Sequence, residues 1–157
     1  MPYGLERYHE TNQSYFVTFS CYKRQRRLAD ARPCDVFIDS LERMRRNHRF
    51  PVYGFTLMPE HVHLLISEPE IGTLAQAIQA LKISVARKLA PFRSGPERLS
   101  GRTVYYDHNV RSHQSFVQKL RYIHRNSVKR GLCANPEDWP WSSFRHYATA
   151  EIGPVEI

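Results

Sequence analysis

The chain has 157 residues, of which 41% are hydrophobic and 12% aromatic, and its formal net charge is +8. This composition predicts one globular domain with a substantial core and excludes an intrinsically disordered chain. No apolar run approaches the roughly 18 residues of a membrane span, and residues 1–7 lack the apolar stretch of a secretory leader. The three cysteines have no metal or disulfide spacing, which indicates buried, reduced thiols in a cytoplasmic protein.

Positive charge is concentrated in one part of the sequence. Residues 92–134 carry nine basic and two acidic side chains, a local charge of +7. Residues 135–157 carry one basic and four acidic side chains, a local charge of −3. A basic segment of this kind is typical of proteins that bind a polyanion such as nucleic acid. A generally basic, soluble surface is the alternative, and the segregation of the charge argues against it.

Hydrophobic periodicity predicts seven elements. Period-two alternation and β-branched or aromatic residues indicate strands, and apolar side chains at a spacing of 3.6 indicate helices. Thr73, and either Ser112 or Ser115, are expected as helix N-caps, and Gly131 as a helix end. In chain order we expect a strand over 14–22, a helix over 33–48, strands over 51–57 and 61–66, a helix over 73–90, a strand over 103–106 and a helix from 112 or 115 to about 128.

The order β-α-β-β-α-β-α predicts an α+β fold of the ferredoxin-like type, an antiparallel sheet with packed helices. A loop is expected over 91–101, and an aromatic segment over 136–147 is expected to pack back on the sheet. We therefore expect a single domain over 1–147 and a short, disordered tail over 148–157.

His61-Val62-His63 is the most informative feature of the chain. Alternation along a strand puts His61 and His63 on the same face and Val62 on the other. Two imidazoles so close can converge on one divalent ion, which suits an enzyme that polarises a phosphate. Two solvent-facing polar residues are the alternative interpretation.

The last predicted helix carries a second candidate group. A helical projection puts Phe116, Leu120 and Ile123 on a buried face, with His124 at its edge. On the opposite, polar side lie Tyr122, Asn126, Lys119 and Lys129. A phenol can attack a phosphodiester when a metal and nearby cations polarise the phosphate. Asn126, one turn after Tyr122, is a candidate oxygen ligand beside the two histidines.

These residues resemble a known family. The segments Gly54–Ile66, Leu120–Leu132 and Pro136–Ser143 are similar, in this order, to the REP-associated tyrosine transposases, a branch of the HUH single-tyrosine transposases of insertion sequences. The resemblance covers about residues 15–147. Ser127 is a departure, since the family usually has proline after the asparagine.

The resemblance implies roles for these residues. Tyr122 would attack a single-stranded DNA phosphate to give a 5′-phosphotyrosine and a free 3′-hydroxyl, while His61, His63 and Asn126 would hold Mg²⁺ or Mn²⁺. The substrate would be a hairpin from a repetitive extragenic palindrome, rejoined without a nucleotide cofactor, in the bacterial cytoplasm at the nucleoid. A monomer is expected, although related enzymes exchange the tyrosine helix within a dimer. The side chains expected to contact DNA are Lys119, Arg121, Arg125, Lys129, Arg130, Lys82, Arg24 and Arg26.

Other interpretations of the histidine pair are possible. His61, His63 and Glu68 imitate the ligand spacing of a cupin, but a cupin is a barrel of many strands. Histidine-triad hydrolases need a third alternating histidine where this chain has Leu65. Relaxases and rolling-circle initiators use similar groups in larger chains with different flanking sequences. A regulator that binds hairpin DNA without cutting it is the non-enzymatic alternative.

Overall fold

A four-stranded antiparallel sheet forms the centre of the molecule. The computed structural model describes residues 13–92 and 106–157. The sheet has the order β2-β3-β1-β4. Its strands are β1 (Ser14–Ser20), β2 (Val52–Leu57), β3 (His61–Ser67) and β4 (Tyr106–Val110).

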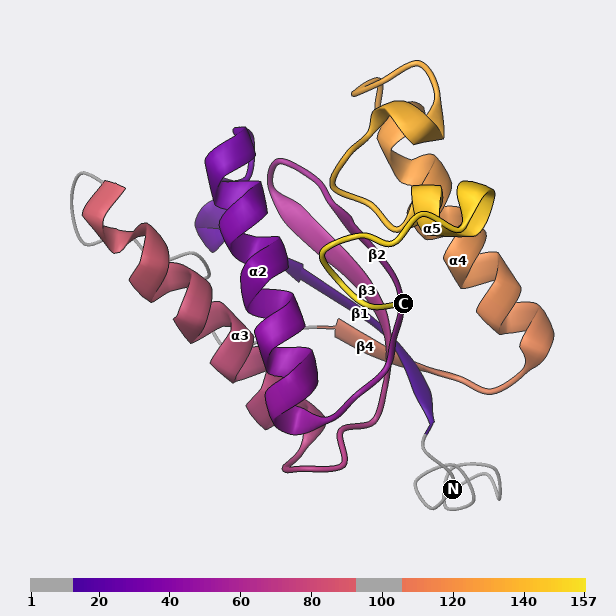
Figure 1. Ribbon diagram of the computed structural model, residues 1–157, viewed down its shortest axis with the longest axis horizontal. Helices are drawn as coiled ribbons and strands as arrows, with labels where there is room; N and C mark the ends of the chain where they lie inside the picture. The colour runs from indigo at the N-terminus through magenta and orange to yellow at the C-terminus, as the bar shows by residue number, and fades with distance from the viewer. Residues whose placement is uncertain (1–12, 93–105) are drawn as a thin grey trace.

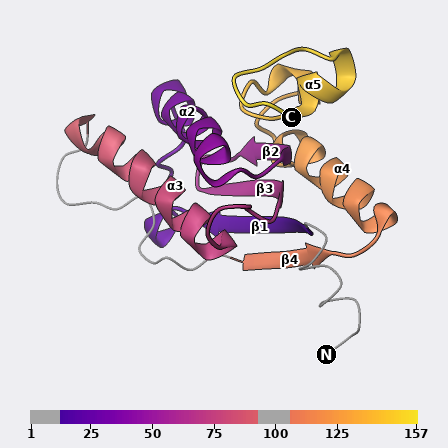
Figure 2. The same cartoon turned by 60° about the horizontal axis from the view of Figure 1, so that its bottom comes forward.

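Helices cover both faces of this sheet. Figures 1 and 2 show α2 and α3 on one face and α4 on the other. Their order along the chain confirms the predicted β-α-β-β-α-β-α arrangement and the α+β class. No helix within the described ranges is long and apolar enough to cross a membrane. The helices are α2 (Ala31–His48), α3 (Leu74–Leu89), α4 (His113–Lys129) and α5 (Phe144–Thr149), with 3₁₀ turns η1 (Tyr22–Arg24), η2 (Ala90–Phe92) and η3 (Pro136–Asp138).

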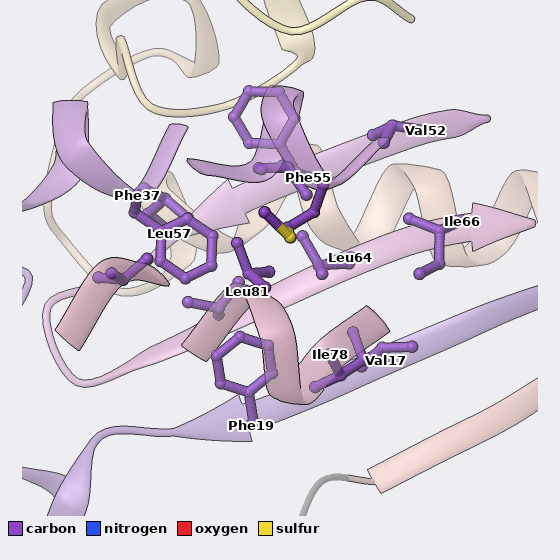
Figure 3. Packing of buried hydrophobic residues seen from close by; sticks show 14 of the residues in the cluster. Val17, Phe19, Phe37, Val52, Phe55, Leu57, Leu64, Ile66, Ile78 and Leu81 are labelled. Atoms are coloured by element: carbon purple, nitrogen blue, oxygen red, sulfur yellow. The ribbon is translucent and has the colours of Figure 1, made fainter. Parts of the chain in front are cut away.

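The two faces of β3 serve different cores. Val62, Leu64 and Ile66 point into the principal core under α2 and α3, part of which is drawn in Figure 3. Leu65 points the other way and packs with Ile123 of α4 in a smaller cluster. Since every residue of β3 is buried, side chains on both of its faces are held in fixed surroundings.

Local sequence explains how α4 reaches the sheet. Ser112 is its N-cap, with its hydroxyl accepting a hydrogen bond from the Ser115 N–H, and Gly131 follows its end with φ +73°. At Gly54 an added Cβ would lie 2.6 Å from Leu120 Cδ1. A side chain at this position in β2 would therefore force the end of the Leu120 side chain on α4 to move, whereas glycine lets it pack directly on the strand.

The segment after α4 covers the edge strand β2, as predicted for the aromatic residues. The Trp139 indole N–H donates to the Leu57 carbonyl at 3.0 Å, and the Leu57 N–H donates to the Trp141 carbonyl at 2.9 Å. Ser143 continues this pairing through its N–H and the Phe55 carbonyl. An edge that would otherwise be open to pairing with another chain is thus occupied.

Several boundaries differ from the sequence-based expectation. The strand expected over 103–106 lies mostly outside the described residues, and β4 instead continues to Val110 because its backbone pairs with β1 and Val110 is buried against α4. The tail over 148–157 was expected to be disordered, yet Val155 is only 3% exposed and joins the principal core. All three cysteines are free, but Cys133 is only partly buried. The loop expected over 91–101 falls outside the described residues from position 93 onward.

Candidate active site

His61 and His63 lie on the α4 face of β3 with their rings close together. Their Nε2 atoms are 2.9 Å apart, so the two imidazoles converge on one point as predicted from their spacing. The solvent-facing alternative is wrong, because His61 is 7% and His63 is 4% exposed. Burial arises because β3 is a central strand and α4 covers this part of the sheet.

Each ring is oriented by a hydrogen bond at its other nitrogen. His61 Nδ1 lies 2.9 Å from Glu60 Oε1, and since a carboxylate accepts, the imidazole donates. His63 Nδ1 lies 2.9 Å from the hydroxyl oxygen of Thr18, its cross-strand neighbour on β1. Phe16 stacks on His63 with ring centroids 5.4 Å apart. These contacts fix which nitrogen of each ring faces the shared point.

The surroundings favour neutral imidazoles. Burial lowers the pKa of His63 to about 3, and the positive potential of His61, Arg130 and Lys119 adds to this. Burial also lowers the pKa of His61, although the hydrogen bond to Glu60 opposes the shift. Neutral imidazole is the form that can offer a lone pair to a metal ion.

Tyr122 of α4 stands against the histidine pair. Its ring centroid is 5.3 Å from that of His63, edge to face, and 5.9 Å from that of Phe16. The side chain is 45% exposed, so a ligand can approach it from solvent. The predicted pairing of a phenol with the two imidazoles is therefore present within a single chain.

Asn126 lies one turn after Tyr122. The helical projection placed it on an exposed polar side of α4, but the structure places it at a buried position. It is 5% exposed, and its amide nitrogen has no hydrogen-bond partner among the described residues. The projection failed here because α4 contacts both β2 and β3 and is followed by a segment that packs back, so more than one side of the helix is covered. A buried amide without a partner is costly unless something else binds it.

The donor set fits an octahedral divalent ion. The 2.9 Å between the two Nε2 atoms is close to the roughly 3.0 Å between neighbouring ligands in an octahedron with bonds of about 2.1 Å. No group of three or more His, Cys, Asp or Glu side chains suited to a metal occurs in 13–92 or 106–157. Asn126 remains the candidate for a third protein ligand through its amide oxygen, and its buried amide nitrogen, which has no hydrogen-bond partner within 13–92 and 106–157, is a donor that a phosphate oxygen could satisfy.

The basic residues expected to contact DNA are not equivalent. Lys119 has its ammonium 4.8 Å above the Phe16 ring, beside the histidines. Arg24 and Arg130 both approach Glu60, at 3.6 and 2.5 Å. Of the other expected DNA contacts, Arg121, Arg125 and Lys129 on α4 and Arg26, two residues after η1, are all exposed.

Lys82 does not belong to this set. The sequence predicted it on an open face of its helix, but it is 6% exposed and lies on α3. Figure 2 shows that α3 covers the face of the sheet opposite to α4. Its ammonium is 4.7 Å above the Phe19 ring, and burial lowers its pKa to about 8. The prediction of an accessible DNA contact at Lys82 is wrong, because the side chain is buried against Phe19 of the principal core.

Three residues of the site were missed by the sequence analysis, namely Glu60, Thr18 and Phe16. Thr18 and Phe16 alternate with the core residues of β1, so the sequence could predict that they share a face of the strand. It could not predict the strand register that pairs Thr18 with His63. An acidic residue directly before a histidine was the available signal for Glu60.

Comparisons with known proteins agree with this architecture. The sequence profile of the family described as "Transposase IS200 like" matches residues 10–126. The chain therefore belongs to the IS200-like transposases.

Within this family the relatives point to one branch. A Haemophilus influenzae protein provisionally named a REP-associated tyrosine transposase is 29% identical over 119 residues, which are 70% of this chain and 68% of that one. The REP-associated tyrosine transposase of Escherichia coli K12 is 20% identical over 96% of this chain and 87% of its own length. A solved structure of a REP-associated tyrosine transposase bound to a REP hairpin has the same fold, with a TM-score of 0.74 and 18% identity over 93% of this chain and 86% of that one.

Proposed function

We propose that this transposase cleaves and rejoins single-stranded DNA at a hairpin of the REP type, using Tyr122 as the nucleophile and a divalent metal. The observation that carries the proposal is the Tyr122 ring 5.3 Å from His63, whose Nε2 is 2.9 Å from that of His61. A DNA-binding protein without catalysis has no need for a half-exposed phenol against two buried, neutral imidazoles.

Each side chain has a role that follows from its chemistry. His61 and His63 would hold Mg²⁺ or Mn²⁺ through Nε2, and the buried amide of Asn126 would supply an oxygen. The metal would polarise a phosphate oxygen and offset charge that develops on it. Lys119, beside Phe16 and His63, would neutralise part of the DNA backbone charge at the same point.

The covalent step is a phosphoryl exchange. The phenolic oxygen of Tyr122 forms a bond to phosphorus while the bond from phosphorus to the 3′-oxygen breaks. The phenolic proton is lost to solvent, and the leaving oxygen takes up a proton to become a free 3′-hydroxyl. Because the tyrosine ester keeps the energy of the phosphodiester, another 3′-hydroxyl can reverse the step and join a new strand without a nucleotide cofactor.

The proposed partner is a DNA hairpin, by analogy with the hairpin-bound relative. The local charge of +7 over 92–134 supports a polyanionic partner. Since Tyr122 meets His63 of its own chain, the site needs no second subunit, which supports a monomer over an exchanged dimer. A DNA substrate implies a location at the bacterial nucleoid.

Trapping the covalent adduct tests this proposal. The protein is incubated with Mn²⁺ and a labelled hairpin carrying a single-stranded flank, and denaturing gels are examined for protein-linked label. We expect an adduct that Tyr122→Phe abolishes while hairpin binding survives. Tyr147→Phe is the matched control, because Tyr147 is also 45% exposed but lies on α5, and it should keep the adduct.

The outcomes separate the two candidate functions. A wild-type protein that binds the hairpin but gives no adduct with Mn²⁺ or Mg²⁺ would favour the non-catalytic regulator. An adduct that persists in Tyr122→Phe would assign the nucleophile to another residue.

A further inference from the structure

Glu60 is a buried carboxylate directly before the histidine pair. Its side chain is only 7% exposed, and a buried charge is costly unless partners compensate for it. One of its oxygens, Oε1, lies 2.9 Å from His61 Nδ1, 2.5 Å from an Arg130 nitrogen and 3.6 Å from an Arg24 nitrogen. Two guanidinium groups and an imidazole N–H surround this oxygen, so Oε1 acts as an acceptor.

The partners of Glu60 come from different elements of the fold. His61 opens β3, and Arg130 is the C-cap of α4, its backbone N–H donating to the Asn126 carbonyl at 2.9 Å. Arg24 belongs to η1 after β1, has a φ of +53°, and also donates to the Ser20 hydroxyl at 3.1 Å. A single carboxylate thus ties the first histidine to the end of the helix that carries Tyr122 and Asn126.

We propose that Glu60 is the positioning residue of the metal site and that Arg130 acts through it rather than mainly as a DNA contact. The inference rests on the proposed function. Accepting from Nδ1, Glu60 holds His61 in the tautomer whose Nε2 lone pair faces His63. Binding Arg130, it fixes the C-terminal end of α4, and with it the distance from Tyr122 and Asn126 to the histidines.

The contacts favour positioning over a direct catalytic role for Glu60. Its Oε1 already accepts from His61 and pairs closely with Arg130, with Arg24 at ion-pair distance, and its ring partner is the nitrogen of His61 that faces away from His63. A carboxylate behind a metal-binding histidine raises the basicity of that ligand and restricts its rotation. Removal of such a carboxylate commonly weakens metal binding by about 10- to 100-fold.

The first test measures the histidine without any metal or DNA. Nitrogen-15 NMR of the metal-free protein, with the His61 signals assigned from a His61→Gln variant, reports which ring nitrogen carries the proton. We expect the Nδ1–H tautomer in the wild type and its loss in Glu60→Ala. Retention of that tautomer in Glu60→Ala would overturn the proposed role, whatever the outcome of the cleavage assays.

The second test separates metal affinity from rate. Mn²⁺ affinity is measured by calorimetry, and adduct formation is followed against Mn²⁺ concentration, for Glu60→Gln, Arg130→Gln and the exposed control Glu137→Gln. For Glu60→Gln we expect about 10-fold weaker Mn²⁺ binding, with a rate that partly recovers at saturating Mn²⁺. For Arg130→Gln we expect a smaller change in Mn²⁺ affinity and at least a 10-fold lower rate at saturation, while the control matches the wild type.

The failures of the two proposals are distinguishable. If the wild type binds Mn²⁺ and forms the adduct but the Glu60 variants bind Mn²⁺ equally well, Glu60 is only a structural residue and the positioning role is wrong. If the wild type forms no adduct, the proposed function fails, and the tautomer measurement still decides the role of Glu60. If Glu60 and Arg130 were only structural residues, Glu60→Gln and Arg130→Gln would lower the melting temperature without changing the affinity of the folded protein for Mn²⁺.

Discussion

The two faces of the sheet are made from the same strands but contain different kinds of side chain. Toward α2 and α3, strand β3 presents Val62, Leu64 and Ile66 to a broad apolar core. Toward α4, the same strand presents His61 and His63, and the apolar cluster beside them is small. The face toward α2 and α3 therefore supplies most of the free energy of folding. This free energy offsets the cost of burying polar groups on the face toward α4.

The largest expected effect comes from adjacent leucines that point to opposite faces. Leu64 and Leu65 are both fully buried, so each change to alanine should lower the free energy of unfolding by about 2–5 kcal/mol. Leu64→Ala should keep the rate of adduct formation per folded molecule. Leu65→Ala should also slow the reaction, because Leu65 packs against Ile123 of the tyrosine helix.

Denaturant unfolding and adduct assays on the folded fraction check this pair of predictions. Equal rates in the two variants would show that the packing of α4 on the sheet does not control the site.

Acid should act mainly on the α4 face. Burial lowers the pKa of His124 to about 4, and its Nε2 lies 2.8 Å from the Ser143 hydroxyl. The unfolded chain takes up this proton near pH 6.5, so stability is complete above that pH and falls as the pH drops from 6.5 toward 4. The loss from this one group is at most about 3–4 kcal/mol.

Melting temperatures between pH 7 and pH 4 measure this effect. His124→Gln should flatten the dependence but not remove it, because His63 has a pKa of about 3 and is also protonated more readily when unfolded. The same slope in the variant and the wild type would exclude His124 as a source of acid sensitivity.

The face with the site contains a matched pair of threonines. Thr18 and Thr56 are the cross-strand neighbours of His63 on β1 and β2. The Thr18 hydroxyl lies within hydrogen-bond distance of His63 Nδ1, whereas the Thr56 hydroxyl is buried with no hydrogen-bond partner in the part of the chain that the structure describes. Thr18→Val should weaken Mn²⁺ binding by about 10-fold, since the hydroxyl steadies the ring for metal binding. Thr56→Val should leave Mn²⁺ affinity unchanged and preserve or increase stability.

Calorimetric titration of both threonine variants with Mn²⁺ is the measurement, and Thr18→Ser should restore most of the affinity. Equal losses in Thr18→Val and Thr56→Val would mean that strand packing, rather than the hydrogen bond, orients His63.

The smallest expected effect concerns two lysines on opposite faces. Lys119→Met should weaken hairpin binding several-fold and reduce the salt dependence of log K by about 0.7–0.9, the contribution of one phosphate contact. Lys82→Met should change neither quantity, because Lys82 is buried on the other face. Binding isotherms at several salt concentrations test the pair, and a reduced salt dependence in Lys82→Met would contradict the assignment.

Local patterns predicted the elements and the shared face of the histidines. The caps Thr73 and Ser112 and the alternation through His61-Val62-His63 act over a few residues, so they are readable in one sequence. The groups that orient the histidines cannot be predicted from local patterns. Thr18 meets His63 only through strand register, and Arg130 meets Glu60 only when α4 folds over β3.

Burial was the harder property to predict. Lys82 and Asn126 are polar and were expected at exposed positions, yet both are nearly inaccessible. A helical projection assumes one buried side, whereas α4 is covered on more than one side and the ammonium of Lys82 lies over the ring of Phe19. In the same way, the aliphatic Val155 in a short tail carried no periodic pattern that would predict its place in the core.

In the proposed metal site, His61 and His63 bind one divalent ion beside Tyr122. Anomalous diffraction at the manganese absorption edge, from crystals grown with Mn²⁺, locates such an ion directly. We expect a single strong peak bonded to Nε2 of both histidines, on the side where Tyr122 stands. A peak bonded to only one histidine, or a site that stays empty at saturating Mn²⁺, would contradict it.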